Sequence, residues 1–365
     1  MSTAKDDISP NPLIAAMAEA LAATPRQSPE EAAESRRLAG LRKQYQFLIN
    51  PNWPEARWDV SGAFIYDREL TSFHDFFLRG HGFKLFSLVH GAPLCLWNSG
   101  RVKWQFHRKP HEIERTVLDY ARRQIALDAT FSNSLLEPKH LDDIRGNLIL
   151  EMLDQANPTG GNGVIISSEL LAEHVRRRHP GLKLVASVVK VTEEDGRGKL
   201  DYYRSMAARY DKVMIHPDDN FNLDLLTQLE DKDKYEILVN EPCLRHCQRR
   251  KAHYRLLSRF SLNLLDTEVE SELTGVMEQN GCSDPVRLLL SQDRRTLTLS
   301  TNEIKRLYDI GFRNFKIQGR GLANPTAVIL EMVRLMLTHD PDHDHQVARC
   351  LAEFMTMLPG KDKGK

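Results

Sequence analysis

The sequence predicts an α/β fold of the (β/α)8, TIM-barrel-like class. From residue 59 onward, short apolar or β-branched runs alternate with amphipathic helical stretches, and eight such runs can be counted. The length of 365 residues also suits a barrel, since one barrel uses about 250 residues or more. A doubly wound open sheet is the structural alternative, because the pattern alone does not prove that the sheet closes.

The strands are predicted from runs of apolar, β-branched and aromatic residues that are bounded by polar clusters. In chain order they are Val60–Tyr66, Phe83–His90, Ile125–Phe131, Gly163–Ser167, Leu182–Val189, Lys212–His216, Tyr235–Asn240 and Asn314–Gln318. Helical periodicity follows most of them, and the last helix begins with a proline, which is favoured there. The predicted helices are Glu69–Leu78, His111–Arg123, His140–Gln155, Glu169–Arg178, Tyr202–Ala208, Leu223–Leu229 and Pro325–Leu337.

Three regions depart from this alternation. Residues 1–40 are rich in Ala, Glu and Arg and carry four prolines, which predicts a mobile helical arm. Residues 58–340 form the expected barrel domain, with a long insertion at 243–307 after the seventh strand. Insertions of this length are usually functional or form a subdomain. Residues 341–365 are expected to form a C-terminal helix and a basic tail.

Composition argues against some classes of function. The chain has 50 Lys+Arg and 50 Asp+Glu, so a protein that mainly coats nucleic acid or an anionic membrane is not indicated. No apolar run reaches the ~18 residues that cross a bilayer, and the N-terminus lacks the order of a secretory signal. A cytoplasmic protein is therefore expected. Five cysteines are too few for a disulfide scaffold, which leaves thiols, metal ligands or packing residues.

In a barrel, functional side chains gather at the carboxyl ends of the strands. Charged residues at predicted strand ends are the best candidates, because burying a charge without a purpose is costly. Asp67 follows the first strand, His216 ends the sixth, Glu241 follows the seventh and Arg320 the eighth. We expect Asp67, His216 and Glu241 to transfer protons, and Arg320 to hold an anionic group.

The segment Asn240–Tyr254, with the sequence NEPCLRHCQRRKAHY, is the sharpest local pattern. Cys243 and Cys247 are four residues apart, so both thiols would face one side if the segment were helical. The neighbouring Arg and His side chains would favour thiolates, which serve as metal or cluster ligands. The spacing by itself does not distinguish ligands from incidental thiols.

This segment resembles the cysteine segment of the collagenase-like peptidase family (U-32), in which a strand delivers a C-x-x-x-C pair followed by Arg and an aromatic residue. Residues Leu299–Gly321 resemble that family's helix and final strand, including its K-I-x-G-R signature at positions 316–320. The resemblance covers mainly residues 235–321. It implies a barrel-like fold, often with four cysteines that hold an iron–sulfur cluster such as 4Fe-4S.

The resemblance implies Cys243, Cys247 and Cys282 as cluster ligands, since Cys282 lies in the region where the family has a further cysteine. The fourth ligand is not matched, because no cysteine lies between Cys95 and Cys243. We expect Cys95 to complete the set from the loop after the second strand. A histidine, an exchangeable site or loss of the cluster are the alternatives. Cys350 is expected to pack as a small apolar residue.

Three functions remain open. The resemblance implies oxygen-independent hydroxylation, or a related redox modification, of a small molecule or RNA. It also allows a peptidase or hydrolase with Cys243 or Cys247 as nucleophile and His246, His253 or His216 as base. The third is a non-catalytic subunit in a homo-oligomer or in a pair with a related protein, since hydroxylating members of the family often work in pairs.

Overall fold

The computed structural model describes residues 28–99, 107–157, 160–262, 296–319 and 325–357. Eight parallel strands form its centre: β1 Arg57–Ser61, β2 Leu88–Gly91, β3 Ala126–Phe131, β4 Gly163–Ile166, β5 Lys183–Ala186, β6 Lys212–Met214, β7 Tyr235–Leu238 and β10 Asn314–Ile317. They close into a barrel in the order β1-β10-β7-β6-β5-β4-β3-β2. The predicted (β/α)8 fold is therefore confirmed, and closure excludes the doubly wound alternative.

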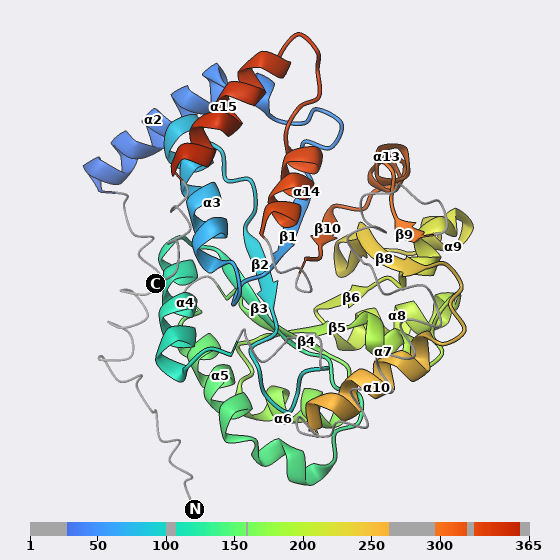
Figure 1. The fold of residues 1–365 in the computed structure, drawn as a ribbon. Helices are drawn as coiled ribbons and strands as arrows, with labels where there is room; N and C mark the ends of the chain where they lie inside the picture. Colours follow the sequence, from blue (N-terminus) through green and yellow to red (C-terminus); the bar gives the residue numbers. More distant parts are fainter. Residues whose placement is uncertain (1–27, 100–106, 158–159, 263–295, 320–324, 358–365) are drawn as a thin grey trace, which may run out of the picture.

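Helices cover the outside of this barrel (Figure 1). Outward-facing strand residues such as Val60, Val89 and Phe315 are buried beneath them. The covering helices are α3 Asp67–His81, α4 Pro110–Arg122, α5 Ile144–Gln155, α6 Glu169–Arg178, α7 Val188–Glu193, α8 Leu200–Arg209, α9 Leu223–Thr227 and α14 Thr326–Met336. Short 3-10 turns are η1 Gln46–Leu48, η3 Pro138–Asp142, η4 Pro217–Phe221 and η5 Lys232–Lys234. No helix in the described ranges is long and apolar enough to cross a membrane.

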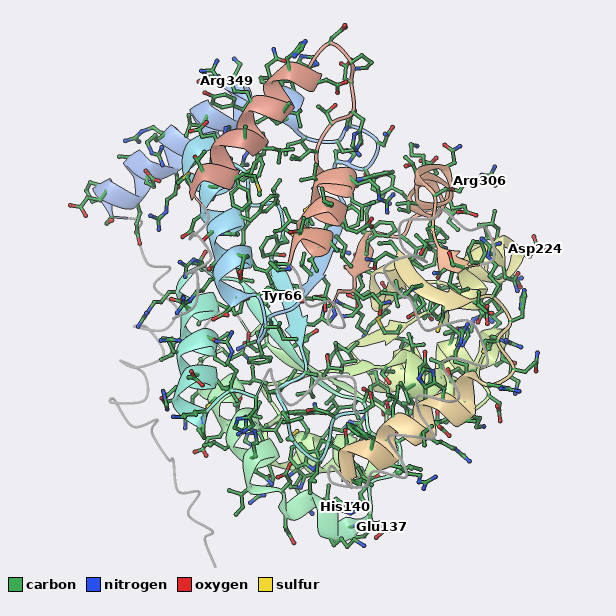
Figure 2. The ribbon with its side chains drawn as sticks, viewed as in Figure 1. Tyr66, Glu137, His140, Asp224, Arg306 and Arg349 are labelled. Carbon is green, nitrogen blue, oxygen red and sulfur yellow. The ribbon has the colours of Figure 1, made fainter. Side chains whose placement is uncertain are left out.

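The first predicted strand, Val60–Tyr66, is displaced along the chain. Strand β1 begins at Arg57 and ends at Ser61, because Gly62 has a φ of 106° and turns the chain. A Cβ atom at Gly62 would lie 2.6 Å from the ring of Tyr66, so a larger residue would clash. Tyr66, labelled in Figure 2, precedes α3 at the end of this turn.

The fifth predicted strand, Leu182–Val189, is too long at its C-terminal end. The Ser187 side chain accepts a hydrogen bond from the backbone N–H of Lys190, 3.1 Å away, and caps the short helix α7. A serine that caps a helix ends the preceding strand, which explains why Val188 and Val189 are helical despite their preference for strands.

The described part of the predicted insertion forms a small subdomain. Strand β8 Asn240–Leu244 pairs antiparallel with β9 Thr296–Thr298, and helices α10 Arg250–Leu262 and α13 Thr301–Asp309 flank this pair. Cys243 lies in β8 and Cys247 in the turn that follows, so the helical arrangement considered for the two thiols does not form. Figure 2 labels Arg306 on α13 and Asp224 on α9, on the side of the molecule where β8 and β9 lie.

The described part of the predicted N-terminal arm is docked on the barrel. Helix α2 Pro29–Gln44 packs against α3, and Arg42 donates a hydrogen bond of 3.2 Å to the carbonyl of Gly82. The C-terminal helix α15 Asp344–Met357 lies in the region where a helix is expected after residue 340, and it packs on α3 (Figure 1). Cys350 is buried there, as predicted, with its Sγ 3.7 Å from Nε2 of His81. The expected basic tail lies outside the described residues.

Candidate active site

Charged side chains cross the interior of the barrel in a group that we call the lumen layer. Lys316 forms ion pairs with Asp59 and, at 3.5 Å, with Glu236. Lys212 Nζ lies 2.9 Å from Oε1 of Glu236, and His90 Nδ1 lies 2.7 Å from Oδ1 of Asp59. The complete layer consists of Asp59, His90, Asp128, Lys212, Glu236 and Lys316.

The electrostatics of the lumen layer keep Asp59 ionised. Burial would raise the pKa of this carboxyl group, but His90 and Lys316 act against burial and hold the pKa below its usual range. Because the ionised carboxylate can only accept a hydrogen bond, the Nδ1 atom of His90 carries a proton and donates it. In the neutral form of this tautomer, the Nε2 atom is the ring nitrogen without a proton.

A small cavity lies above the lumen layer, at the carboxyl ends of the strands. We call it the mouth pocket; its volume is about 50 Å³. The Oγ1 atom of Thr130 is buried in its wall without a hydrogen bond to any described residue. The walls are His90, Thr130, Ser132, Ile165, Ser187, Val188, Val189, Met214, Leu238, Glu241, Tyr254, Lys316 and Gln318. A volume of this size admits only a small group, next to His90 and Lys316.

A second buried cluster surrounds His216. Its Nδ1 lies 3.2 Å from the backbone nitrogen of Asp218, and its Nε2 lies 3.4 Å from Nη1 of Arg250. Asp218 also accepts hydrogen bonds from Arg197, at 3.0 Å, and from the backbone N–H of His246, at 2.8 Å. Burial and the positive charge of Arg250 lower the pKa of His216 to about 3, so this imidazole is neutral at physiological pH.

A cavity of about 370 Å³ opens beside this cluster. It is lined in part by Cys247 and by helices α7 and α10, which also line the mouth pocket. Its basic side chains are Arg197, Lys199, Arg250 and Lys251, and its carboxylates are Asp195 and Asp218. The excess of positive charge favours an anionic group in this cavity.

The predicted catalytic residues are only partly brought together. Glu241 is buried in the wall of the mouth pocket, where its Oε1 accepts a hydrogen bond of 3.2 Å from the backbone N–H of Cys243. His216 lines the neighbouring cavity. Asp67 lines neither cavity, and its carboxylate is bound by Arg108, at 2.7 Å, and by Thr116. Arg320 lies outside the described residues.

The cysteines fit the implied cluster only in part. Cys243 and Cys247 are half-buried and in no disulfide, and Cys243 lies close enough to the Arg250 guanidinium for a thiolate there to interact with it. Cys95 is buried in the hydrophobic core, and burial raises the pKa of its thiol far above the usual value, which opposes the thiolate that a cluster needs. Within the described ranges, no group of three or more His, Cys, Asp or Glu side chains is arranged to hold a metal. Cys282 lies outside these ranges.

Known proteins offer a structural likeness and no match in sequence. A solved structure described as a U32 peptidase is similar to this chain. The match covers 65% of this chain and 86% of that chain, with 14% sequence identity and a TM-score of 0.41. No protein-family model and no curated protein matches the chain. A similarity at this level decides neither activity nor ligands, so the function has to be argued from the site.

A prediction from charged residues at the ends of the strands misses the lumen layer. Four of its charges lie within strands, one in each of the runs WDVS, ALDAT, YEIL and NFKI. In each run the charged residue stands between apolar neighbours that are buried under the helices. This alternation is a usable signal, because a strand whose apolar residues face the helices must direct the residues between them into the barrel.

Proposed function

We propose that this protein is a barrel enzyme that transfers a proton to or from a small-molecule substrate in the mouth pocket. The Asp59–His90 pair, with Lys316 beside it, is the observation that carries the proposal. His90 is the acid–base group, and Asp59 is a positioning residue that fixes the ring and its tautomer. Lys316 supplies a positive charge close to where negative charge would develop on the substrate.

The position of the pair within the fold supports this assignment. Barrel enzymes bind their substrates at the carboxyl ends of the strands, and the mouth pocket lies there. Its small volume would take the reacting group alone. The neighbouring basic cavity would then take an anionic part of the same substrate, since α7 and α10 line both spaces.

A substrate search with a matched variant tests the proposal. Purified protein is incubated with a small-molecule metabolite extract, and the extract is compared by mass spectrometry before and after. We expect at least one compound to be converted by the native protein and by His111→Gln, which changes an exposed histidine on α4. His90→Gln should convert it at least about a hundredfold more slowly. Equal conversion by His90→Gln would refute the role of His90.

The iron–sulfur protein implied by the resemblance is a second candidate. The proximity of Arg250 to Cys243 favours it, because a cation next to a thiol stabilises the thiolate. Cys243, Cys247 and Cys282 would hold the cluster, which when bound would supply electron transfer for oxygen-independent hydroxylation or related chemistry. Cys95 is left out of this ligand set because it lies in the core.

Iron and acid-labile sulfide, counted per chain after anaerobic purification, test the second candidate. Each of Cys243→Ser, Cys247→Ser and Cys282→Ser should remove the iron, whereas Cys350→Ser, at a buried packing position, should leave it. Protein without iron under these conditions would eliminate the cluster.

The hydrolase alternative has less support in the geometry. The ring nitrogens of His216 face Asp218 and Arg250, and a pKa of about 3 makes this imidazole a weak base for a thiol. A non-catalytic role in an oligomer stays a proposal that a measurement of the molecular mass in solution would test.

A further inference from the structure

A second large cavity lies at the opposite end of the barrel, at the amino ends of the strands. Its volume is about 390 Å³, within the range of about 300–1,000 Å³ that small-molecule sites occupy. First residues of several strands line it, among them Arg57, Lys183 and Lys212, and the lower face of the lumen layer forms its floor. We call it the basal cavity. The proposed acid–base chemistry does not use it.

Asp128 is a buried carboxylate in the wall of the basal cavity. Its exposed fraction is 3%, yet it forms no hydrogen bond or ion pair with any described residue. The Oε2 atom of Glu236, also in this wall, accepts no hydrogen bond within the described ranges and lies 3.5 Å from Nζ of Lys316. A buried carboxylate without a donor is costly, so a donor from outside the chain would stabilise it.

The backbone leaves room for Asp128 to remain in this position. A Cβ atom on Gly163, the first residue of β4, would lie 2.8 Å from Oδ1 of Asp128 and 2.6 Å from the carbonyl oxygen of Lys183. Any larger residue at position 163 would therefore push the carboxylate out of its place. The position of the Asp128 carboxylate in the cavity wall therefore depends on glycine at position 163.

The charges of the basal cavity do not balance. Its carboxylates are Asp59, Asp128, Asp211, Asp233 and Glu236. Its cations are Arg57, Lys183 and Lys212, to which Lys316 is added because it pairs with two of the carboxylates. Five carboxylates therefore face four Lys and Arg side chains, and Asp128 and Asp211 form no ion pair with a described residue. Asp211 accepts a hydrogen bond of 2.8 Å from the backbone N–H of Leu184, so Asp128 is the carboxylate with neither kind of partner.

From this geometry we infer that the basal cavity binds a small molecule that carries a primary ammonium group, held by Asp128 and Glu236. An ammonium group has three N–H donors, which match the two carboxylates. A metal ion is a poorer match, because the described residues contain no group of three or more ligand side chains arranged for one. The ammonium group would enter from the amino ends of the strands, away from the mouth pocket.

The pH dependence of binding makes this inference specific. Burial raises the pKa of Asp128 to about 7. The positive charges of Lys212 and, more weakly, Lys316 lower this pKa, whereas the negative charges of Asp59 and, more weakly, Glu236 raise it. His90 is the register neighbour of Asp128 on β2. A proton on Asp128 competes with the ammonium group, while an alkylamine stays charged at pH 6 and 8. Affinity should therefore fall about tenfold from pH 8 to pH 6.

Titration calorimetry of the full chain with 1,4-diaminobutane tests the inference, with 1,4-butanediol as the uncharged control of similar shape. At pH 8 the diamine should bind and the diol should not. Asp128→Asn, which keeps the shape of the side chain, should remove the binding. Asp309→Asn, which deletes the same charge in an exposed ion pair on α13, should retain it.

Three outcomes would overturn the inference. The first is no binding of the diamine at pH 8. The second is equal binding by Asp128→Asn, which would mean that the amine binds other carboxylates. The third is the same affinity at pH 6 and pH 8, because surface carboxylates with ordinary pKa values are ionised at both. Thermal unfolding of Asp128→Asn without ligand checks that the variant is folded.

Discussion

Asp59 holds two other side chains of the lumen layer in place, because its carboxylate contacts both of them. It bonds to His90 through one oxygen and to Lys316 through the other. All three side chains are buried, so each charge depends on the others for its solvation. Removing one partner from such a group leaves another charge buried without compensation.

This dependence predicts a large loss of stability in Asp59→Asn. The ammonium group of Lys316 would keep only the longer contact of 3.5 Å to Glu236, so we expect the free energy of unfolding to fall by about 3 to 5 kcal/mol. Urea denaturation measures this change. Asp309→Asn is the matched control, since it breaks an exposed Lys–Asp pair on α13 and should cost less than about 1 kcal/mol. Equal losses in the two variants would mean that Asp59 does not hold the lumen layer together.

Because the pKa of Asp128 is raised, we expect this residue to lower the stability of the protein as the pH rises. A carboxylate in an ion pair has the opposite effect. The pKa of Asp128 is about 7 in the folded protein and near the ordinary value of about 3.8 in the unfolded chain. Between these two values the unfolded chain has lost the proton and the folded protein keeps it, so stability falls as the pH rises from about 4 to about 7. Above pH 7 both states are ionised and the difference stays constant.

Comparison with Asp128→Asn isolates this effect from other titrating groups. The amide cannot ionise, so the variant should be close to the native protein in stability at pH 4 and more stable at pH 8, by roughly 2 to 4 kcal/mol. Urea denaturation of both proteins at the two pH values gives the difference. A variant that is less stable than the native protein at pH 8 would show that Asp128 has a partner in the absence of ligand.

At the scale of elements, helix α2 depends on the glycine that ends α3. Gly82 has a φ of 80°, a left-handed conformation that glycine adopts without strain. A Cβ atom there would lie 2.4 Å from the carbonyl oxygen of Leu38 and 2.7 Å from the backbone nitrogen of Arg42, both in α2. The two helices can thus approach closely only because position 82 has no side chain.

Gly82→Ala should therefore loosen α2 and lower the stability by about 1 to 3 kcal/mol. Gly80→Ala is the matched control in the same helix, because a Cβ atom at position 80 would have nothing within 4 Å and alanine favours helices. It should leave the stability unchanged or raise it by up to about 1 kcal/mol. Thermal unfolding measures both changes. If Gly82→Ala proved as stable as Gly80→Ala, the close contact between α2 and α3 would be wrong.

At the scale of the whole molecule, periodicity predicts the barrel and leaves most of the candidate site undetected. The eight strands follow from apolar runs. Their bounds differ most at β1 and β5, where Gly62 and Ser187 end the strand, and at β2, which begins at Leu88 and not at the predicted Phe83. The strand ends at Gly62 and Ser187 depend on backbone angles and single hydrogen bonds, which residue types indicate only weakly. Local sequence patterns therefore predict the order of the helices and strands but not the residues at which they end.

The predicted site residues lie in different parts of the structure for a related reason. His216 follows β6, and Glu241 lies near the start of β8, just after β7, so both reach the cavities near the mouth. Asp67 begins α3 instead, after a turn that the sequence pattern assigns to the strand, and it binds Arg108. The pairing of Asp59 with His90 and Lys316 joins positions far apart in the chain, so it becomes visible only once the barrel is closed.

The proposed chemistry depends on Asp59 holding His90 in the tautomer that leaves Nε2 to exchange the proton. NMR of protein with ¹⁵N-labelled histidine reports this tautomer, with the His90 signals assigned by their absence in His90→Gln. We predict that Nδ1 of His90 carries a proton at neutral pH and donates it to Asp59. A His90 ring with the proton on Nε2 and none on Nδ1 at neutral pH would refute both the pairing and the acid–base role built on it.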